Sequence, residues 1–467
     1  MSEKYYELKQ STDLIYINMF RENINIVLYV ANDVEFSETY NFLAEKSNNR
    51  LVKFAHSDNI YYIGNIGEYT VALVKGGIVG QESTLSSIIT INKALKTFYN
   101  CDYLITVGVC GGFKGKVALG DVVVAYEMIN YESQKIHDGK ITDRSQGLIS
   151  GDLGYKLSSE VALMNFGYFD VHFGKVLSGN KVVSDKDFAE KLLEIHPDAM
   201  ALDMEGYAVA RVAVTKKLKD WIFIKSPSDF LQDKQGSRGQ DKATRNALVV
   251  LEKLLYSPNL LHKRKMKVLI SGAYVFDAND TPEAEQLAYA LSQRLVDENY
   301  KLVSGYGMCI GNALVAGAYN SYCTNHTLGE SLQNILEVYP FPRIVSGSIN
   351  KTLNAIKYEN RQLMAKGCSF TIFLYGRKND DSLSEGMEEE FRLASNSFVI
   401  PVGCTGYMAS ELWSRVNTNF EKYYPNNATI KKSFLALNAP VRTIDQIVDR
   451  VLDLMEKVKT YYLDFKV

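Results

Sequence analysis

Three strand-like runs of the sequence end in side chains that can carry out acid–base chemistry. Glu35 follows INIVLYVA, Asp203 and Glu205 follow AMAL, and Asp229 follows WIFIKSPS. Because ligands of open α/β sheets bind beyond the carboxyl ends of the strands, these acids are candidates for one site. A carboxylate can accept hydrogen bonds from a diol or, once protonated, donate a proton to a leaving group. Each also has an ordinary structural explanation, since Asp203 could cap a helix and Asp229 could belong to a turn after Pro227.

Two consecutive α/β blocks contain the elements that must position these acids. Short β-branched runs alternate with longer amphipathic segments, which is typical of largely parallel sheets flanked by helices. The first block ends in ATRNALVVLEKLLYS and the second restarts at KVLISGAYVF, with the linker-like PNLLHKRKMK before it. We predict an extension over residues 1–24, a first domain over 25–261 and a second over 262–467. The extension could be an oligomer contact or a loosely held helix.

Composition and charge exclude several classes of protein. With 52 basic and 54 acidic side chains, no global field draws the chain onto nucleic acid or an anionic membrane. The longest apolar runs are well short of the about 20 residues that span a bilayer, and the polar N-terminus does not resemble a signal peptide. The six cysteines form no CxxC motif or Cys/His pair. We therefore expect a cytoplasmic protein with no bound metal and no cofactor.

The motifs of the first block resemble, in the same order, those of the nucleoside phosphorylase and nucleosidase superfamily. TVGVCGGFKGKVALGDVVVA is similar to the family's glycine turn and following strand, and SGNKVV to the segment before the sugar site. LDMEGYAVA is similar to the Met-Glu signature, and KSPSDF to the Ser-Asp purine segment. The resemblance implies a mixed sheet flanked by helices and a reaction at the N-glycosidic bond of a purine nucleoside or nucleotide.

The resemblance implies a role for each acid. Glu205 would bind the ribose 2′ and 3′ hydroxyls with Met204 under the sugar, and the two oxygens of a carboxylate suit a cis-diol. Asp229, oriented by Ser228, would donate a proton to purine N7 and must therefore be protonated near neutral pH. Glu35 would activate the attacking water. The other implied substrate contacts are Gly111, Gly112, Val183 and Phe188.

The residues around the glycine turn bear on the attacking group. Phosphorylases with a similar VGxCG turn bind phosphate through an arginine and a serine at positions that are Thr106 and Val109 here. Neither can replace a guanidinium, so hydrolysis is favoured over phosphorolysis. Asp33 stays an alternative to Glu35 as the base, because the family's usual glycine before this segment is Val30. Cations near the motifs could meet the phosphates of a nucleotide or lie in solvent, namely Lys75, Lys181, Arg211 and Lys225.

A second glycine-rich turn opens a helix in the second block. The spacing of VSGYGMCIG is one residue longer than the GxGxxG fingerprint, although such a turn can still bind an anion or simply be tight. The segments ENRQLMAKGCSFTIFLYG, EGMEEEFRLA and FVIPVGCTGYMA resemble the SLOG superfamily, which includes nucleotide sensors and Lonely Guy phosphoribohydrolases. The resemblance implies a Rossmann-like domain. SEGMEEEF replaces the enzymes' PGGxGT turn, which favours sensing over catalysis.

The SLOG resemblance implies a site for a signal nucleotide. Arg361 is the strongest candidate contact, because a guanidinium can fork onto phosphate oxygens. Tyr306 and Tyr375 could stack on a base or pack in the core. The other expected contacts are Ser271, Gly272, Gly305, Gly307, Gly311, Asn312, Glu390, Thr405 and Gly406.

The order of the two domains resembles that of effectors of bacterial anti-phage systems. It implies an N-ribosyl hydrolase of purine nucleosides or nucleotides that is gated by a nucleotide second messenger. A homo-oligomer is expected as well, because the first family closes its sugar site with a neighbouring subunit. Two other functions stay open, a housekeeping nucleosidase or phosphorylase with a regulatory domain and a non-catalytic nucleotide sensor. The acids Glu35, Glu205 and Asp229 argue against the sensor.

Overall fold

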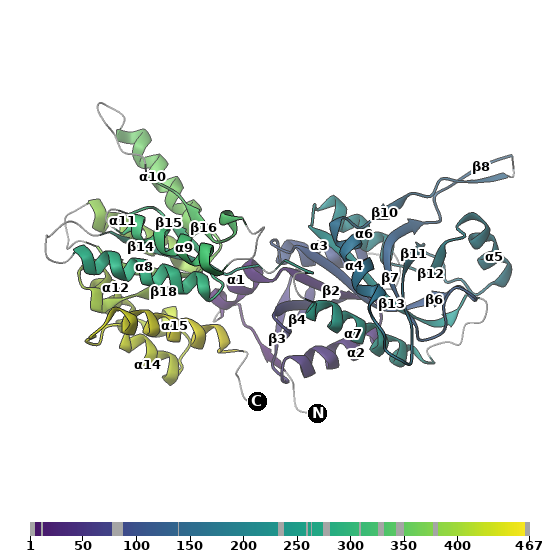
Figure 1. Ribbon diagram of the computed structural model, residues 1–467, viewed down its shortest axis with the longest axis horizontal. Coiled ribbons are helices and arrows are strands. Elements are labelled where there is room, and N and C mark those ends of the chain that lie inside the picture. The colour runs from purple at the N-terminus through teal and green to yellow at the C-terminus, as the bar shows by residue number, and fades with distance from the viewer. Residues whose placement is uncertain are drawn as a thin grey trace. The chain divides into compact units, whose positions relative to one another are not determined.

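The chain folds into two compact units in the computed structural model (Figure 1). The first unit contains Asn23–Arg264 with the described residues of Met1–Lys9 and Tyr462–Val467, and the second contains Gln10–Glu22 and Lys265–Tyr461. The segment predicted as an extension therefore contributes to both units. The structure describes residues 5–10, 13–76, 87–138, 140–231, 238–257, 260–262, 264–273, 281–307, 310–325, 331–341, 350–376 and 382–462.

An 11-stranded mixed sheet forms the first unit. Its strands are β1 Tyr5–Glu7, β2 Ile26–Val30, β3 Leu51–His56, β4 Asn59–Ile66, β5 Tyr69–Lys75, β6 Tyr103–Gly112, β7 Val122–Asn130, β10 Gly147–Ile149, β11 Val171–Ser178, β12 Ala199–Asp203 and β13 Asp220–Phe230. They are ordered β1-β3-β4-β5-β2-β6-β12-β11-β7-β10. Because β13 pairs with both β6 and β7, the strands β6, β12, β11, β7 and β13 close into a ring. A separate pair consists of β8 Gln134–His137 and β9 Lys140–Asp143.

The strand pairings bring the acid-bearing segments together. β2 and β13 both run parallel to β6, so the three strands end at the same edge. β12 runs antiparallel to the last residues of β6, with Leu202 opposite Gly111. This pairing places Asp203 beside the glycine turn at the end of β6. The mixed sheet and the α/β class confirm the predicted fold class for this part of the chain.

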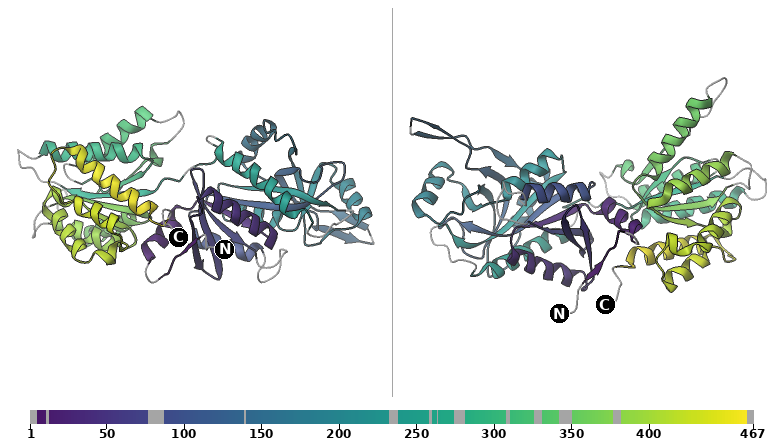
Figure 2. Two further views of the ribbon diagram at one scale, coloured as in Figure 1. Left: turned by 90° about the horizontal axis from the view of Figure 1, so that it is seen from below. Right: turned by 180° about the vertical axis from the view of Figure 1, so that it is seen from behind.

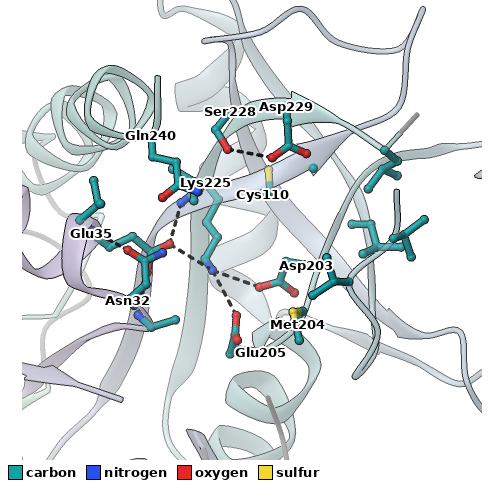
Figure 3. A pocket seen from close by; sticks show the side chains of 18 of the residues that line it. Asn32, Glu35, Cys110, Asp203, Met204, Glu205, Lys225, Ser228, Asp229 and Gln240 are labelled. Atoms are coloured by element: carbon teal, nitrogen blue, oxygen red, sulfur yellow. Dashed lines mark hydrogen bonds and ion pairs between the residues drawn. The ribbon is translucent and has the colours of Figure 1, made fainter. Parts of the chain in front are cut away.

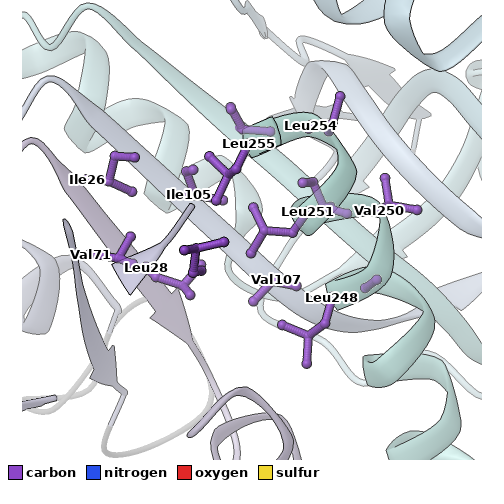
Figure 4. Close-up of a cluster of buried hydrophobic side chains, with 14 of the residues drawn as sticks. Ile26, Leu28, Val71, Ile105, Val107, Leu248, Val250, Leu251, Leu254 and Leu255 are labelled. Atoms are coloured by element: carbon purple, nitrogen blue, oxygen red, sulfur yellow. The ribbon is translucent and has the colours of Figure 1, made fainter. Parts of the chain in front are cut away.

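Apolar helix faces cover the sheet of the first unit. Leu248, Leu251 and Leu255 of α7 recur at helical spacing and are buried in one cluster with Leu28 of β2 and Val107 of β6 (Figure 4). Burying each such side chain stabilises the fold by about 2 kcal/mol. The helices of this unit are α2 Asp33–Lys46, α3 Ser87–Thr97, α4 Asp152–Ala162, α5 Lys186–Ile195, α6 Gly206–Thr215 and α7 Gln240–Tyr256.

A five-stranded parallel sheet forms the second unit. Its strands are β14 Lys267–Ala273, β15 Lys301–Ser304, β16 Leu336–Val338, β17 Cys368–Tyr375 and β18 Phe398–Pro401. In the order β16-β15-β14-β17-β18, the chain adds β15 and β16 on one side of β14 and then β17 and β18 on the other side. Ligands of such sheets bind at the carboxyl ends of the two strands where the order switches, which are β14 and β17. This is the predicted Rossmann-like arrangement.

Helices flank the sheet of the second unit (Figure 2). They include α1 Leu14–Asn23 from the predicted extension, whose Tyr16 donates its hydroxyl hydrogen to the carbonyl oxygen of Val458 at 2.6 Å. Because Tyr16, Ile17, Met19 and Phe20 are buried, α1 is packed rather than loosely held. Within the described ranges, no helix is long and apolar enough to cross a membrane. The other α-helices of the second unit are α8 Thr281–Asp297, α9 Gly311–Asn325, α10 Asn350–Ala365, α11 Ser382–Leu393, α12 Tyr407–Thr418, α13 Phe420–Tyr423, α14 Ala428–Ala436 and α15 Ile444–Thr460.

Candidate active site

A cavity of about 520 Å³ lies at the strand ends of the first unit (Figure 3). Its size is that of a small-molecule pocket. The segments after β2, β11 and β12 and the ends of β6 and β13 contribute its walls. The predicted residues that line it are Glu35, Gly111, Val183, Met204, Glu205, Ser228 and Asp229.

A capping box at the start of α2 fixes Glu35. The side chain of Asn32 accepts a hydrogen bond from the N–H of Glu35, and the Oε2 atom of Glu35 accepts bonds from the N–H groups of Ala31 and Asn32 at 2.7 and 3.2 Å. Its Oε1 atom accepts the N–H of Val109 at 2.8 Å. The carboxylate thus connects the helix start to the glycine turn. Asp33, the alternative base, is instead largely exposed and paired with Lys75.

Gly108 leaves the space that Glu35 occupies. A Cβ atom at this position would lie 2.0 Å from the Oε1 atom of Glu35, and the φ angle of +151° disfavours other residues. We expect Gly108→Ala to displace the carboxylate of Glu35 and to lower kcat/KM by about 100-fold for any reaction in which Glu35 is a reacting group, because small displacements of such a group cost about that much. Gly115→Ala is the matched control, since Gly115 also has a positive φ angle, +84°, but nothing within 4 Å of the added atom. Equal losses in the two variants would contradict this role of Gly108.

Lys225 is the central cation of the cavity. Its side chain on β13 is buried, and its Nζ atom lies 3.7 Å from Glu35, 3.2 Å from Asp203 and 3.6 Å from Glu205. Burial alone would lower the pKa of Lys225, but the three carboxylates outweigh this effect and hold it well above the usual value. The sequence suggested Lys225 only as a possible phosphate contact. The structure shows instead that its charge is shared among three acids.

Asp203 and Glu205 differ in how they meet the start of α6. Asp203 accepts the N–H of Gly206 at 2.9 and 3.1 Å, which is the helix-capping role considered for it. Glu205 occupies the N-cap position but makes no capping hydrogen bond with its side chain. Its carboxylate lies beside Lys225 in the cavity wall. Glu205 is therefore the better placed of the two to accept hydrogen bonds from a bound diol.

Asp229 lies one residue before the end of β13, at a break in the strand register. The pairing with β6 shifts between Pro227 and Asp229, and such irregularities redirect side chains. Ser228 donates a hydroxyl hydrogen to the Oδ2 atom of Asp229 at 3.4 Å, and both residues are buried. An added Cβ on Gly111 would lie 3.6 Å from the Oδ1 atom of Asp229. Asp229 is thus held against the glycine turn.

An apolar wall borders Asp229. Val183, Leu202 and Leu231 line the cavity and belong to one buried cluster. A Cβ on Gly111 would lie 2.4 Å from the Cδ2 atom of Leu231, so this wall reaches the same turn as Asp229. A flat heterocycle with one polar edge fits such a surface.

Two predicted contacts do not line the cavity. Gly112 faces away, since an added Cβ would meet Val117 and Pro227 at 2.9 and 3.0 Å. Phe188 on α5 packs edge-on against Tyr131 at 6.3 Å between ring centroids, as part of the same apolar cluster. Neither residue is among those that line the cavity, so their predicted contacts with a substrate stay predictions.

A buried ionic network lies at the crevice of the second unit. Ser271 on β14 donates a hydrogen bond to Glu390 on α11, and the Nε atom of Arg361 on α10 lies 3.4 Å from the same carboxylate. Arg361 also bonds Glu389 at 2.7 Å and lies over the ring of Phe341. Burial raises the pKa of Glu390, and its bonds to Ser271 and Arg361 oppose this. The predicted phosphate contact is thus already paired with acids.

The other predicted contacts of the second unit gather at the same strand ends. The hydroxyl of Tyr306 donates to Asn312, and the N–H of Tyr375 donates to the Oγ1 atom of Thr405 at 2.9 Å. Gly406 precedes α12 with a φ angle of +77°. Four of the predicted glycines lie too close to neighbouring atoms for a larger residue. A Cβ atom added to any of them would lie within 3 Å of another atom; they are Gly272, Gly305, Gly307 and Gly311.

Comparisons with known proteins match both parts of the chain. Residues 25–255 match the model of the phosphorylase superfamily, and residues 258–458 match that of the Sir2- and TIR-associating SLOG family. The NAD(+) hydrolase ThsA of Bacillus cereus is 28% identical over 319 residues, which are 66% of this chain and 61% of that protein. This chain therefore spans less than two thirds of the hydrolase's length.

Two further relatives match about two fifths of the chain each. A 5′-methylthioadenosine/S-adenosylhomocysteine nucleosidase of Maridesulfovibrio salexigens is 28% identical over 203 residues, 42% of this chain and 85% of that protein. A death domain-containing ATP nucleosidase of Amphimedon queenslandica is 29% identical over 198 residues, 37% of each protein.

Proposed function

We propose that this chain, which joins a domain of the phosphorylase superfamily to a domain of the Sir2- and TIR-associating SLOG family, is a purine N-ribosyl hydrolase gated by a nucleotide signal. One observation carries the proposal: Glu35, Glu205 and Asp229 line one cavity, together with an apolar wall beside Asp229. The names of the relatives, which include hydrolases and nucleosidases, support the same reaction class.

The proposed reaction breaks the bond between ribose C1′ and purine N9. Asp229 donates its proton to N7, so that the base leaves as a neutral molecule. Glu205 accepts hydrogen bonds from the 2′ and 3′ hydroxyls, and its charge favours the positive sugar of the transition state. Glu35 takes a proton from water as its oxygen bonds to C1′. The products are free base and ribose, or ribose phosphate from a nucleotide.

The charges of the cavity favour water over phosphate as the attacking group. The cations among its described lining residues are Lys181 and Lys225. Lys225 already meets three carboxylates, and Lys181 bonds Glu132 at 2.6 Å. A phosphate dianion would have to enter beside those acids, and the described lining residues include no arginine. Thr106 and Val109 occupy the positions of the phosphorylases' phosphate ligands, and neither can replace a guanidinium.

Product analysis tests the proposed reaction. The full chain would be incubated with adenosine, guanosine, 5′-methylthioadenosine, AMP, ATP and NAD(+), each with and without phosphate, and the products separated by chromatography. We expect free base together with the sugar that keeps the substrate's 5′ group, which is ribose from a nucleoside, 5-methylthioribose from 5′-methylthioadenosine or a ribose phosphate from a nucleotide, independent of added phosphate. Ribose 1-phosphate formed only with phosphate would identify a phosphorylase instead. No free base from any substrate, even when AMP, ATP, NAD(+) or ADP-ribose is added as a second nucleotide to act as the signal, would support a non-catalytic sensor.

The proposed signal site is the crevice at the carboxyl ends of β14 and β17. A nucleotide phosphate there would compete with Glu389 and Glu390 for Arg361. A ligand that binds the active state more tightly than the resting state raises the population of the active state, to the extent set by the difference between the two affinities. We further propose that the chain acts in bacterial anti-phage defence, as the order of the domains implies. We also propose a homo-oligomer, because the first family closes its sugar site with a neighbouring subunit, and a cytoplasmic location.

We expect Arg361→Ala to remove thermal stabilisation by the signal nucleotide. In the full chain, a nucleotide present at 100 times its Kd should stabilise the protein by about 2.7 kcal/mol, and the variant should lose most of this shift. AMP, ATP, NAD(+) and ADP-ribose would be compared by thermal unfolding. Arg415→Ala is the matched control. Arg415 on α12 pairs with Glu388, which lies on α11 like the two acids that pair with Arg361, but the side chain of Arg415 is half exposed. An equal shift in the wild type and Arg361→Ala would exclude Arg361 as a contact.

A further inference from the structure

The loop of residues 179–183, after β11, forms part of the cavity wall. Lys181, Val182 and Val183 line the cavity, and Val183 packs in the cluster that contains Leu202 and Leu231. Val183, Leu202 and Leu231 form the apolar wall beside Asp229, where the purine is proposed to bind. The position of this loop therefore determines the width of the space beside Asp229.

Glu132, just after β7, holds this loop from outside the cavity. Its Oε2 atom accepts hydrogen bonds from the N–H of Asn180 at 2.8 Å and from the Nδ2 atom of the same residue at 3.2 Å. Its Oε1 atom accepts a bond from the Nζ atom of Lys181 at 2.6 Å. The N–H of Glu132 in turn donates to the side chain of Asn130 at 3.1 Å. One carboxylate thus binds two consecutive residues of the loop.

Gly179 allows the loop to lie close to Tyr131 and Glu132. A Cβ atom at this position would lie 2.5 Å from the Cε1 atom of Tyr131 and 2.9 Å from the Cγ atom of Glu132. The N–H of Tyr131 also donates to the carbonyl oxygen of Ser178 at 3.3 Å. The strand end and the side chains of Tyr131 and Glu132 therefore fit together as one packed contact.

The charge of Glu132 is stabilised in this contact. Burial would raise the pKa of Glu132, but the hydrogen bonds from Lys181 and Asn180 outweigh burial and lower it. The carboxylate is therefore ionised at neutral pH and can accept all three bonds from the loop at once. The side chain is 20% exposed, so these bonds are partly shielded from water.

We propose that Glu132 is a positioning residue for purine binding, which it controls by holding residues 180 and 181 and thereby the apolar wall beside Asp229. This inference rests on the proposed nucleosidase function. Glu132 does not line the cavity, and its described contacts are with the loop and with Asn130. Its loss should therefore weaken binding of the base more than it slows the chemical step.

Steady-state kinetics of Glu132→Ala test the proposal in the full chain. With adenosine as substrate, we expect KM to rise about tenfold while kcat stays within about threefold of the wild type. Calorimetric titration with free adenine should show a similar loss of affinity. Glu132→Gln should recover part of the affinity, because an amide oxygen can still accept the N–H of Asn180.

Glu190→Ala is the matched control, since Glu190 forms an exposed ion pair with Lys186 on neighbouring α5. Unchanged KM and adenine affinity in folded Glu132→Ala, or a fall in kcat alone, would overturn the role of Glu132. If Glu132→Ala does not fold, Glu132→Gln carries the same test. A wild-type chain that binds adenine but releases no base from adenosine, even with AMP, ATP, NAD(+) or ADP-ribose added as the signal, would refute the proposed reaction, while the titrations still test Glu132. A wild type that neither binds adenine nor cleaves would overturn both.

Discussion

Asp229→Asn should reduce the release of purine from adenosine by about 1,000-fold while the protein stays folded. A positioned general acid contributes about 100-fold to 10,000-fold, and an asparagine amide cannot supply the proton. The side chain keeps its size and can still accept the hydrogen bond that Ser228 donates to it. A loss of this size would therefore report the missing proton rather than a disturbed cavity.

The leaving group separates proton donation from other roles of Asp229. 4-Nitrophenyl riboside releases the stable 4-nitrophenolate anion, so its leaving group needs no proton. Asp229→Asn should therefore hydrolyse it within about tenfold of the wild-type rate, whereas adenosine cleavage is lost. Gly108→Ala, which displaces Glu35, should slow both substrates alike. If Asp229→Asn slowed the two substrates equally, Asp229 would not be the acid.

The sequence predicted the parts of the site that local patterns encode. The alternation of strands and helices indicated two α/β blocks, and the matches to two family models confirm this resemblance. The capping box from Asn32 to Glu35 is also a local pattern, but it was not predicted; it was found in the structure, where it fixes the orientation of Glu35. Each predicted acid ends or follows a strand, and parallel pairing with β6 brings two of these strand ends to one edge.

The sequence could not predict contacts that depend on distant segments. Lys225 is buried among acids that come from the starts of α2 and α6 and the end of β12, so its surroundings appear only in the folded chain. The carboxylate of Glu132 likewise meets a loop 48 residues away. The motifs also do not tell which way a residue at a strand or helix end faces, and in the structure Gly112 and Phe188 face away from the cavity. The N-terminal helix α1 gave no sign that it packs in the second unit.

Lys225→Met should destabilise the first unit by about 3–5 kcal/mol, because removing one partner leaves buried charges without compensation. Methionine has nearly the length of lysine, so packing changes little while the charge is lost. Because the pKa of Lys225 lies above its usual value, this residue is charged throughout the range below about pH 10 in the wild type. The three carboxylates of the variant would then repel one another across a space that no cation fills.

The pH dependence of unfolding distinguishes lost charge from lost packing. Without Lys225, the folded state should bind more protons than the unfolded chain, so the stability of Lys225→Met should recover as the pH falls from 7 to 5. Chemical denaturation at several pH values measures this, with Lys225→Arg as the control that keeps the charge. A constant deficit between pH 7 and 5 would indicate a packing defect alone. Recovery in Lys225→Met but not in Lys225→Arg would show that one buried cation allows Glu35, Asp203 and Glu205 to be ionised in one cavity, and the proposed hydrolysis requires this of Glu35 and Glu205.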